Sequence, residues 1–147
     1  KSLFGALVNV DHMNDVKNYI KWLRKTAKAT DCQVLVTECH LHEDEQNNGR
    51  VGKKKAHIVV LLVGPRGAVK NMLKRWRTSK VDIDSKGKPC LERMMTVIGE
   101  GCVVNDFNVD NLRKMNDGGL TCRFTRDGLR DFVCKVWGPT WLTILDT

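Results

Sequence analysis

The stretch AHIVVLLV, residues Ala56–Val63, decides the fold because its last six residues are all apolar. A strand of this composition has no polar side to turn to solvent, so it is buried on both faces and lies centrally in a sheet. Gly64 and Pro65 follow it and predict a helix cap and a first helical turn. That helix has an apolar stripe made by Val69, Met72, Leu73 and Trp76. A central strand followed by an amphipathic helix is therefore the starting point for the fold.

The chain before this stretch predicts a strand, a helix and a second strand. Leu3–Val10 has the length and alternation of a strand, and Asp11–Asn14 is typical of a turn with a helix cap. From Val16 the apolar residues recur with helical spacing, at Tyr19, Ile20, Leu23 and Ala27. Cys32–Leu41 is rich in β-branched and apolar residues and predicts a strand, whereas the polar segment His42–Lys55 predicts a loop.

The chain after the second predicted helix completes a recognisable order of elements. Thr78–Pro89 predicts an extended or looped connection, and a fourth strand lies within Leu91–Ile98, where Gly99 and Gly101 close it. The resulting order, β-α-β-β-α-β, is the split βαβ or ferredoxin-like arrangement. The sequence therefore predicts an α+β fold with a ferredoxin-like core in residues 1–104, in which both helices pack on one face of an antiparallel sheet.

Residues 105–147 are predicted to form a C-terminal helical extension packed on this core. Its elements are a short helix near Asn108–Met115, a turn at residues 117–119, a short extended segment Leu120–Phe124 and a last helix. The last helix follows a cap at Thr125 and ends at Gly138 and Pro139. Its apolar face is made by Leu129, Phe132, Val133, Val136 and Trp137. We expect the extension to cover the sheet edge or the face opposite the first two helices.

The composition sets limits on the class of protein. A length of 147 residues with 41% hydrophobic residues fits one compact domain with a sizeable core. The longest apolar run, Ile58–Val63, is far too short to cross a bilayer, so no membrane partner is predicted. Six cysteines without a C-x-x-C pair are interpreted as reduced and intracellular, which predicts a nuclear or cytoplasmic location.

The net charge of +8 is unevenly distributed along the chain. Residues 46–81 hold ten basic side chains and no acidic one, whereas the segments on either side are nearly neutral. Such a local concentration of positive charge suggests a polyanionic partner. Two basic stripes lie on the outer faces of the predicted helices, and they are formed by Lys17, Lys21, Arg24 and Lys28 on the first and by Arg66, Lys70, Lys74 and Arg77 on the second. Because both helices are predicted to pack on the same face of the sheet, their outer faces lie side by side, and we expect the stripes to merge into one phosphate-binding face.

Several segments resemble a known domain family. They are KVDIDSKGKPCLERMM at Lys80–Met95, the preceding Thr78 and Ser79, and VDHM at Val10–Met13. With these segments the chain resembles the family formed by the C-terminal domains of RWD-domain-containing protein member three and, more distantly, of the splicing factor Prp three.

The resemblance implies a ferredoxin-like core with C-terminal additions and no catalytic activity. It implies contact with small nuclear RNA for the splicing-factor branch. For the RWD branch it implies a role in promoting SUMO conjugation, assigned chiefly to an N-terminal RWD domain that is not visible in these 147 residues. The polar loop His42–Lys55 looks longer than expected for the family, so its lysines inherit no role.

Other chemistries have weaker support in the sequence. The third strand has no aromatic residue, which argues against base stacking on the sheet. Gly64–Gly67 mimics a phosphate-clamping GXXG loop but follows a strand, unlike the loop of KH domains. Cys39, His40 and His42 alternate across a strand, so no metal site is predicted. No residues combine into a nucleophile, base and oxyanion site, and no cofactor is predicted.

Two function hypotheses follow. The leading one is a non-enzymatic accessory domain that binds RNA, with backbone contacts to structured RNA, through the joined basic helix faces within a ribonucleoprotein or larger assembly. The alternative is a protein-interaction module associated with SUMO conjugation. Trp22 and Trp141 are its candidate partner contacts, because Trp22 lies off the apolar face of its helix and Trp141 lies in the terminal segment.

Overall fold

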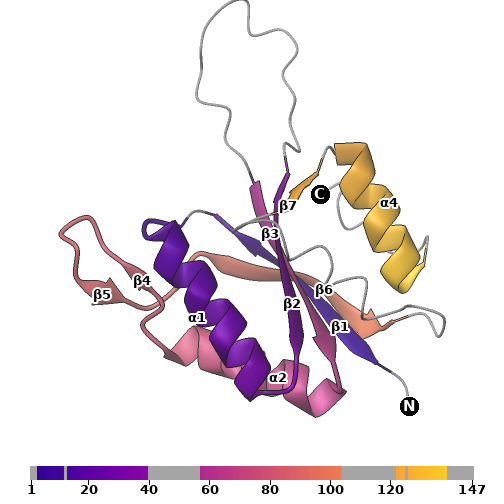
Figure 1. Cartoon of the computed structure of the whole chain (residues 1–147), viewed down its shortest axis with the longest axis horizontal. Helices are drawn as coiled ribbons and strands as arrows, with labels where there is room; N and C mark the ends of the chain where they lie inside the picture. The colour runs from indigo at the N-terminus through magenta and orange to yellow at the C-terminus, as the bar shows by residue number, and fades with distance from the viewer. Residues whose placement is uncertain (1–2, 12, 40–56, 104–121, 125, 139–147) are drawn as a thin grey trace, which may run out of the picture.

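The computed structural model describes residues 3–11, 13–39, 57–103, 122–124 and 126–138. These residues form three layers, with two helices on one face of a sheet and one helix on the other (Figure 1). The elements, in chain order, are β1 (Phe4–Val10), α1 (Val16–Ala29), β2 (Gln33–Cys39), β3 (His57–Gly64), α2 (Arg66–Thr78), β4 (Asp82–Ile83), β5 (Pro89–Cys90), β6 (Met95–Cys102), β7 (Cys122–Phe124) and α4 (Arg126–Trp137). The predicted α+β class is confirmed.

The main sheet has the strand order β6-β1-β3-β2-β7. β1 pairs antiparallel with both β3 and β6, β2 pairs antiparallel with β3, and β7 pairs parallel with β2. The predicted antiparallel sheet of four strands is therefore present, and β7 extends it at the β2 edge. Each of the two longer connections, through α1 and through α2, leads to a strand two places away in the sheet.

β3 has the central, doubly buried position predicted for it. Val60 and Leu62 face α1 and α2, whereas Val59, Leu61 and Val63 face α4. All five side chains are buried. One apolar strand thus holds together two separate hydrophobic layers, which is why its sequence has no polar alternation.

Helix α4 covers the sheet face opposite α1 and α2, as expected for the C-terminal extension. Val133 and Trp137 of α4 pack in one cluster with Leu7 and Leu61 of the sheet. The contact is tightest at Gly5, where a Cβ atom would lie 2.5 Å from Trp137 Cζ2. A side chain at this position of β1 would displace the indole, so the glycine allows the helix to approach the sheet.

Several predicted boundaries were wrong. The fourth strand runs through Gly99 and Gly101 to Cys102 instead of ending before them, because a strand at the sheet edge tolerates glycines beside a bulge opposite Leu7 and Val8. Gly64 is the last residue of β3, and Pro65 is the N-cap of α2.

The connection predicted at Thr78–Pro89 also has more structure than expected. Thr78 ends α2, and the residues after it contain the β4–β5 hairpin. Gly87 turns this hairpin with a positive φ of 79°.

Other predictions fall outside the described residues: the short helix at Asn108–Met115, the turn at 117–119, the cap Thr125 and the tail with Trp141. The division at residue 104 stays a prediction. No helix within the described ranges is long and apolar enough to span a membrane. Cys32, Cys90, Cys102 and Cys134 are free thiols.

Candidate functional site

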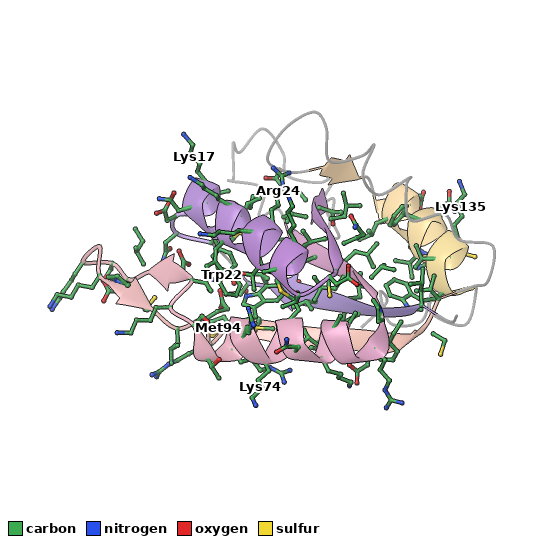
Figure 2. The ribbon with its side chains drawn as sticks, turned by 60° about the horizontal axis from the view of Figure 1, so that its bottom comes forward. Lys17, Trp22, Arg24, Lys74, Met94 and Lys135 are labelled. Atoms are coloured by element: carbon green, nitrogen blue, oxygen red, sulfur yellow. The ribbon has the colours of Figure 1, made fainter. Side chains whose placement is uncertain are left out.

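Among the eight predicted nucleic-acid-binding residues, the three that Figure 2 labels do not lie on one side of the helix pair. α1 and α2 do lie beside each other, since the Tyr19 and Trp76 rings meet edge to face at 6.4 Å. Trp22 and Ala68 pack at the margin of the same cluster. Figure 2 shows Trp22 between the two helices, Lys17 and Arg24 on the side of α1 turned away from α2, and Lys74 on the side of α2 turned away from α1.

The basic residues belong to two groups, one on each helix. The α1 group comprises Lys17, Lys21, Arg24 and Lys28, and the α2 group comprises Arg66, Lys70, Lys74 and Arg77. Trp22, which packs against the core, lies between the two helices (Figure 2). The merging of all eight residues into one surface stays a prediction. Whether either group binds a nucleic acid stays a prediction.

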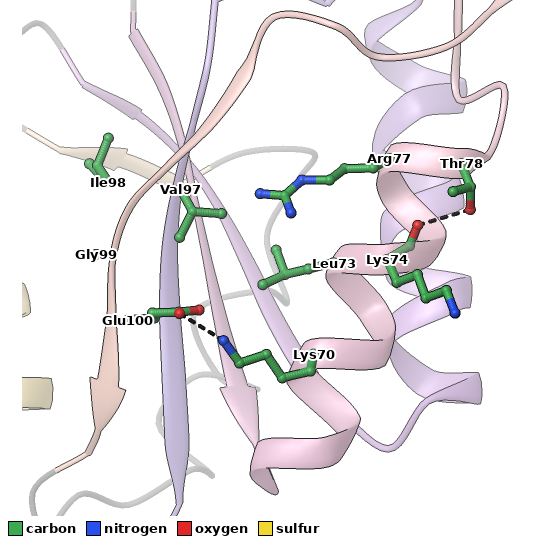
Figure 3. A pocket seen from close by; sticks show the side chains of 9 residues that line it. All are labelled: Lys70, Leu73, Lys74, Arg77, Thr78, Val97, Ile98, Gly99 and Glu100. Atoms are coloured by element: carbon green, nitrogen blue, oxygen red, sulfur yellow. Dashed lines mark hydrogen bonds and ion pairs between the residues drawn. The ribbon is translucent and has the colours of Figure 1, made fainter.

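Lys70 and Arg77 of the α2 group are directed toward the edge strand β6, and α2 and β6 enclose a groove, here named the α2–β6 groove (Figure 3). It is lined by Lys70, Leu73, Lys74, Arg77, Thr78, Val97, Ile98, Gly99 and Glu100. The groove was not predicted, because the sequence does not reveal which side of an amphipathic helix faces the sheet edge.

One end of the groove is closed by an ion pair. Lys70 Nζ lies 2.7 Å from Glu100 Oε1, and the two side chains are 45% and 37% exposed. The Lys70 ammonium also lies 5.5 Å from the centre of the Phe4 ring, and Arg66 Cζ lies 5.7 Å from the same ring centre. Lys70 and Arg66 thus rest on the aromatic face, which attracts cations, and Glu100 neutralises part of their charge.

The other end of the groove keeps its positive charge. The Arg77 guanidinium extends from α2 toward β6, near Val97, whereas the Lys74 side chain is directed away from the strand (Figure 3). Among the described residues, neither cation has an acidic partner. Leu73 and Val97 supply the apolar part of the lining. An exposed guanidinium beside an apolar floor is suited to bind a carboxylate on a partly apolar chain.

β6 provides backbone groups next to this groove. It is the last strand of the sheet, and within the described residues only β1 pairs with it. The bulge lies between the pairs Leu7–Gly99 and Val8–Val97, so Ile98 has no partner in the register. Most residues of β6 remain half-buried or exposed. The groove is thus bordered on one side by cations of α2 and on the other by a strand edge to which no further described strand is paired.

The segment that carries the family resemblance forms a different, closed structure. The Asp82 carboxylate accepts hydrogen bonds from the backbone N–H groups of Asn14 and Asp15, at 3.0 Å and 2.9 Å. Asn14 Nδ2 donates to the Ile83 carbonyl at 2.7 Å. These contacts attach the β4–β5 hairpin to the start of α1. The Asp11 N–H donates to the Met94 carbonyl at 3.2 Å, so the two resembling segments, Val10–Met13 and Lys80–Met95, meet in space beside this attachment.

A buried hydrogen-bonded chain lies beside this attachment. Trp76 Nε1 donates to the Tyr19 hydroxyl at 2.8 Å, and that hydroxyl donates to Glu92 Oε2 at 2.7 Å. The Met94 backbone N–H donates to Glu92 Oε1 at 2.7 Å. Burial, together with the hydrogen bond to Glu92, raises the pKa of the Tyr19 phenol far above its ordinary value. No sequence pattern indicates these roles of Asp82 and Glu92, apart from their place in the resembling segment.

The remaining candidate residues are only partly located. Trp22 is half-buried against the α1–α2 core, and Trp141 lies outside the described residues. His40, His42 and the Cys39 side chain also lie outside them. Elsewhere in the described part of the chain, no three His, Cys, Asp or Glu side chains come together as metal ligands.

Comparisons with known proteins find relatives from several organisms that carry the same protein name. RWD domain-containing protein 3 of Rattus norvegicus is 35% identical over 98 residues, which cover 67% of this chain and 31% of that protein. The Homo sapiens protein of the same name is 34% identical over the same shares, and the Xenopus tropicalis protein is 31% identical over 68% of this chain and 32% of its own length. No family model matches the chain.

The resemblance to RWD domain-containing protein 3 is thus confirmed as sequence similarity over two thirds of this chain. The matched part spans less than a third of each relative, so the assignment to its C-terminal domain stays a prediction. None of these findings supports the more distant resemblance to the splicing factor.

Proposed function

We propose that this chain is a non-enzymatic protein-interaction module that docks an acidic segment of a partner protein in the α2–β6 groove. The observation that carries the proposal is the Arg77 guanidinium, which extends over Val97 without an acidic partner among the described residues. A partner carboxylate would complete a charge-assisted hydrogen bond there, and apolar atoms beside it would cover Leu73 and Val97.

The similarity to RWD domain-containing protein 3 supports an interaction role over an enzymatic one. We further propose that this interaction is associated with SUMO conjugation. That part of the proposal depends on the sequence resemblance alone. A nuclear or cytoplasmic location and a ferredoxin-like classification are proposed with it. The strand order β6-β1-β3-β2 with a helix in each crossover supports that classification.

RNA binding is the competing function, and it has less support. Its premise is one surface made by both helices, whereas Lys17 and Arg24 of α1 and Lys74 of α2 lie on opposite sides of the helix pair (Figure 2). The comparisons also give no support to it. A protein partner needs only the α2 group, whereas a helical RNA would use any exposed lysine along its backbone. The two functions therefore predict different responses to the same set of charge reversals.

The test uses three matched variants: Arg77→Glu at the groove, Lys74→Glu on the same helix but directed away from β6, and Lys21→Glu on α1. All three change the charge equally at exposed residues. Binding of each variant is titrated by fluorescence polarisation against two probes, a glutamate- and valine-containing peptide and a short RNA duplex. We expect Arg77→Glu to weaken peptide binding about tenfold, which corresponds to loss of one charged contact.

Lys74→Glu and Lys21→Glu are expected to change peptide affinity much less, and the RNA probe is expected to bind weakly and to lose affinity equally with all three variants. The proposal is wrong if the three reversals weaken peptide binding equally, or if the wild type binds the RNA and not the peptide. Circular dichroism of each variant checks that the fold is intact.

A further inference from the structure

We infer that the acidic partner segment binds as an extended strand, added to the outer edge of β6, with its acidic side chains on the same face of the sheet as α2. This inference rests on the proposed function and gives the bound conformation and the pattern of the partner. It follows from three features of the described residues: the direction of the β6 backbone groups, the side-chain alternation of β6 and the distribution of charge beside it.

The first feature is the direction of the backbone groups. In an antiparallel ladder, the residue pairs that exchange hydrogen bonds alternate with pairs that do not. The Val103 N–H donates to the Leu3 carbonyl at 2.9 Å, so the bonded pairs on this side of the bulge are those of Val103, Gly101 and Gly99. The backbone groups of Glu100 and Cys102 therefore point to the outer edge.

No strand among the described residues takes up these outward groups. A row of outward N–H and C=O groups is a template for another strand. Natural edges are often protected by a bulge or an inward charge, and β6 has a bulge at Ile98. That bulge leaves Gly99–Cys102 as a regular segment, which is long enough for a short strand to pair.

The second feature is the alternation of side chains. Val97 belongs to the cluster under α1 and α2, whereas Ile98 belongs to the cluster under α4. Glu100 returns to the α2 side, where it contacts Lys70. Side chains opposite one another in paired strands share a face. Every second side chain of an added strand would therefore lie on the α2 side, next to Arg77 and Lys70.

The third feature is the charge. On the α2 side of β6, two cations directed toward the strand, Lys70 and Arg77, meet one carboxylate, Glu100, among the residues that line the groove. An added strand with acidic residues at every second position would complement the surplus. The same spacing leaves the alternate positions for apolar residues. The pattern thus describes the partner: an extended segment in which acidic and β-branched residues alternate.

The experiment uses a synthetic peptide in which glutamate alternates with valine, and a second peptide of the same composition with the glutamates in one block. Two further versions of the alternating peptide are N-methylated, one at the glutamate nitrogens and one at the valine nitrogens. Only one of these two sets of N–H groups can face β6 in an added strand. The affinities are measured for wild type and Arg77→Glu, and amide hydrogen exchange is followed at Glu100 and Cys102.

We expect the alternating peptide to bind at least about tenfold more tightly than the block peptide, and one N-methylated version to lose about tenfold while the other keeps its affinity. Exchange at Glu100 and Cys102 should slow when the peptide binds. Equal affinities of the two methylated versions, with unchanged exchange at both amides, would overturn strand addition.

The two proposals fail in different ways. If Arg77→Glu weakens binding selectively while the methylated peptides behave alike, groove docking stands and strand addition is wrong. If Arg77→Glu has no selective effect, the proposed function itself is wrong. The Glu100→Gln variant gives a second measurement. It releases Lys70 from its ion pair and keeps every backbone group of β6, so the affinity for the alternating peptide should increase severalfold.

Discussion

Trp76 and Arg77 are adjacent in the sequence, yet they belong to two regions of opposite character. Trp76 is fully buried and donates to Tyr19, whose hydroxyl donates to the buried Glu92. Arg77 is exposed and extends over the α2–β6 groove with no described acidic partner. Around Trp76 the polar side chains form hydrogen bonds within the fold, whereas in the groove the Arg77 guanidinium can still bind a partner. The density of charged residues along the sequence does not distinguish a polar group buried in the fold from one exposed in the groove. Tertiary packing makes this difference.

The largest contrast is expected between substitutions at these two neighbours. Trp76→Ala removes a fully buried indole and its hydrogen bond, and we expect it to lower the free energy of unfolding by about 3–5 kcal/mol. Arg77→Ala should change it by less than about 0.5 kcal/mol because the side chain is exposed. Urea denaturation followed by circular dichroism measures both. Similar losses for the two variants would show that Arg77 is structural.

A second contrast compares two glutamates. Glu92→Ala leaves the Tyr19 hydroxyl and the Met94 N–H without their acceptor, which should lower the free energy of unfolding by about 2 kcal/mol. Glu100→Ala is the matched control, because its ion pair is exposed and should contribute less than about 1 kcal/mol. If Glu100→Ala proves as damaging as Glu92→Ala, the groove is a structural element and not an open site.

The attachment of the hairpin should have a smaller effect. Asp82→Ala removes the acceptor for two N–H groups at the start of α1, and we expect a loss of about 1 kcal/mol, typical of a helix-end cap. Asp82→Asn retains one carbonyl oxygen and should lie between wild type and alanine. Hydrogen exchange at the Asn14 and Asp15 amides gives the local readout. Unchanged exchange in Asp82→Ala would contradict the assigned role.

The fourth prediction concerns alkaline pH. The chain has one tyrosine, so phenolate absorbance reports Tyr19 alone. Its pKa is raised in the folded state by burial and by Glu92. Below about pH 10 the phenol is protonated in both states, and this group gives no pH dependence. Above that pH the unfolded chain loses the proton first, so stability falls as pH rises. Phenolate absorbance should therefore appear only with unfolding, and its appearance in folded protein near pH 10 would contradict the burial.

Much of the fold could be predicted from periodicity. The apolar run before Gly64 predicted a doubly buried central strand, and the spacing of Tyr19, Ile20 and Leu23 predicted the buried face of α1. These patterns are reliable because burial acts directly on the residue types. The end of β6 was missed, since Gly99 and Gly101 are tolerated at an edge strand and their presence was interpreted as a stop.

The candidate site was only half predictable. The sequence identified the cations of α2. The direction in which they point depends on how the helix is rotated about its own axis, and tertiary packing sets that rotation. Trp22 and Ala68 pack against the core cluster under α1 and α2, whereas Lys70 and Arg77 are directed toward β6 and Lys74 is directed away from it. The buried carboxylates Asp82 and Glu92 could not be told from surface acids, because Asn14 and Tyr19, to which they are hydrogen-bonded, lie more than sixty residues away in the chain.

The most direct test of the groove as the docking site is an NMR titration of the ¹⁵N-labelled chain with the alternating glutamate–valine peptide. We predict that the amide shifts change most at Leu73, Arg77, Val97 and Glu100 and remain small at Lys17, Lys21 and Lys28. Changes concentrated on α1, or spread evenly over all exposed lysines, would contradict the account.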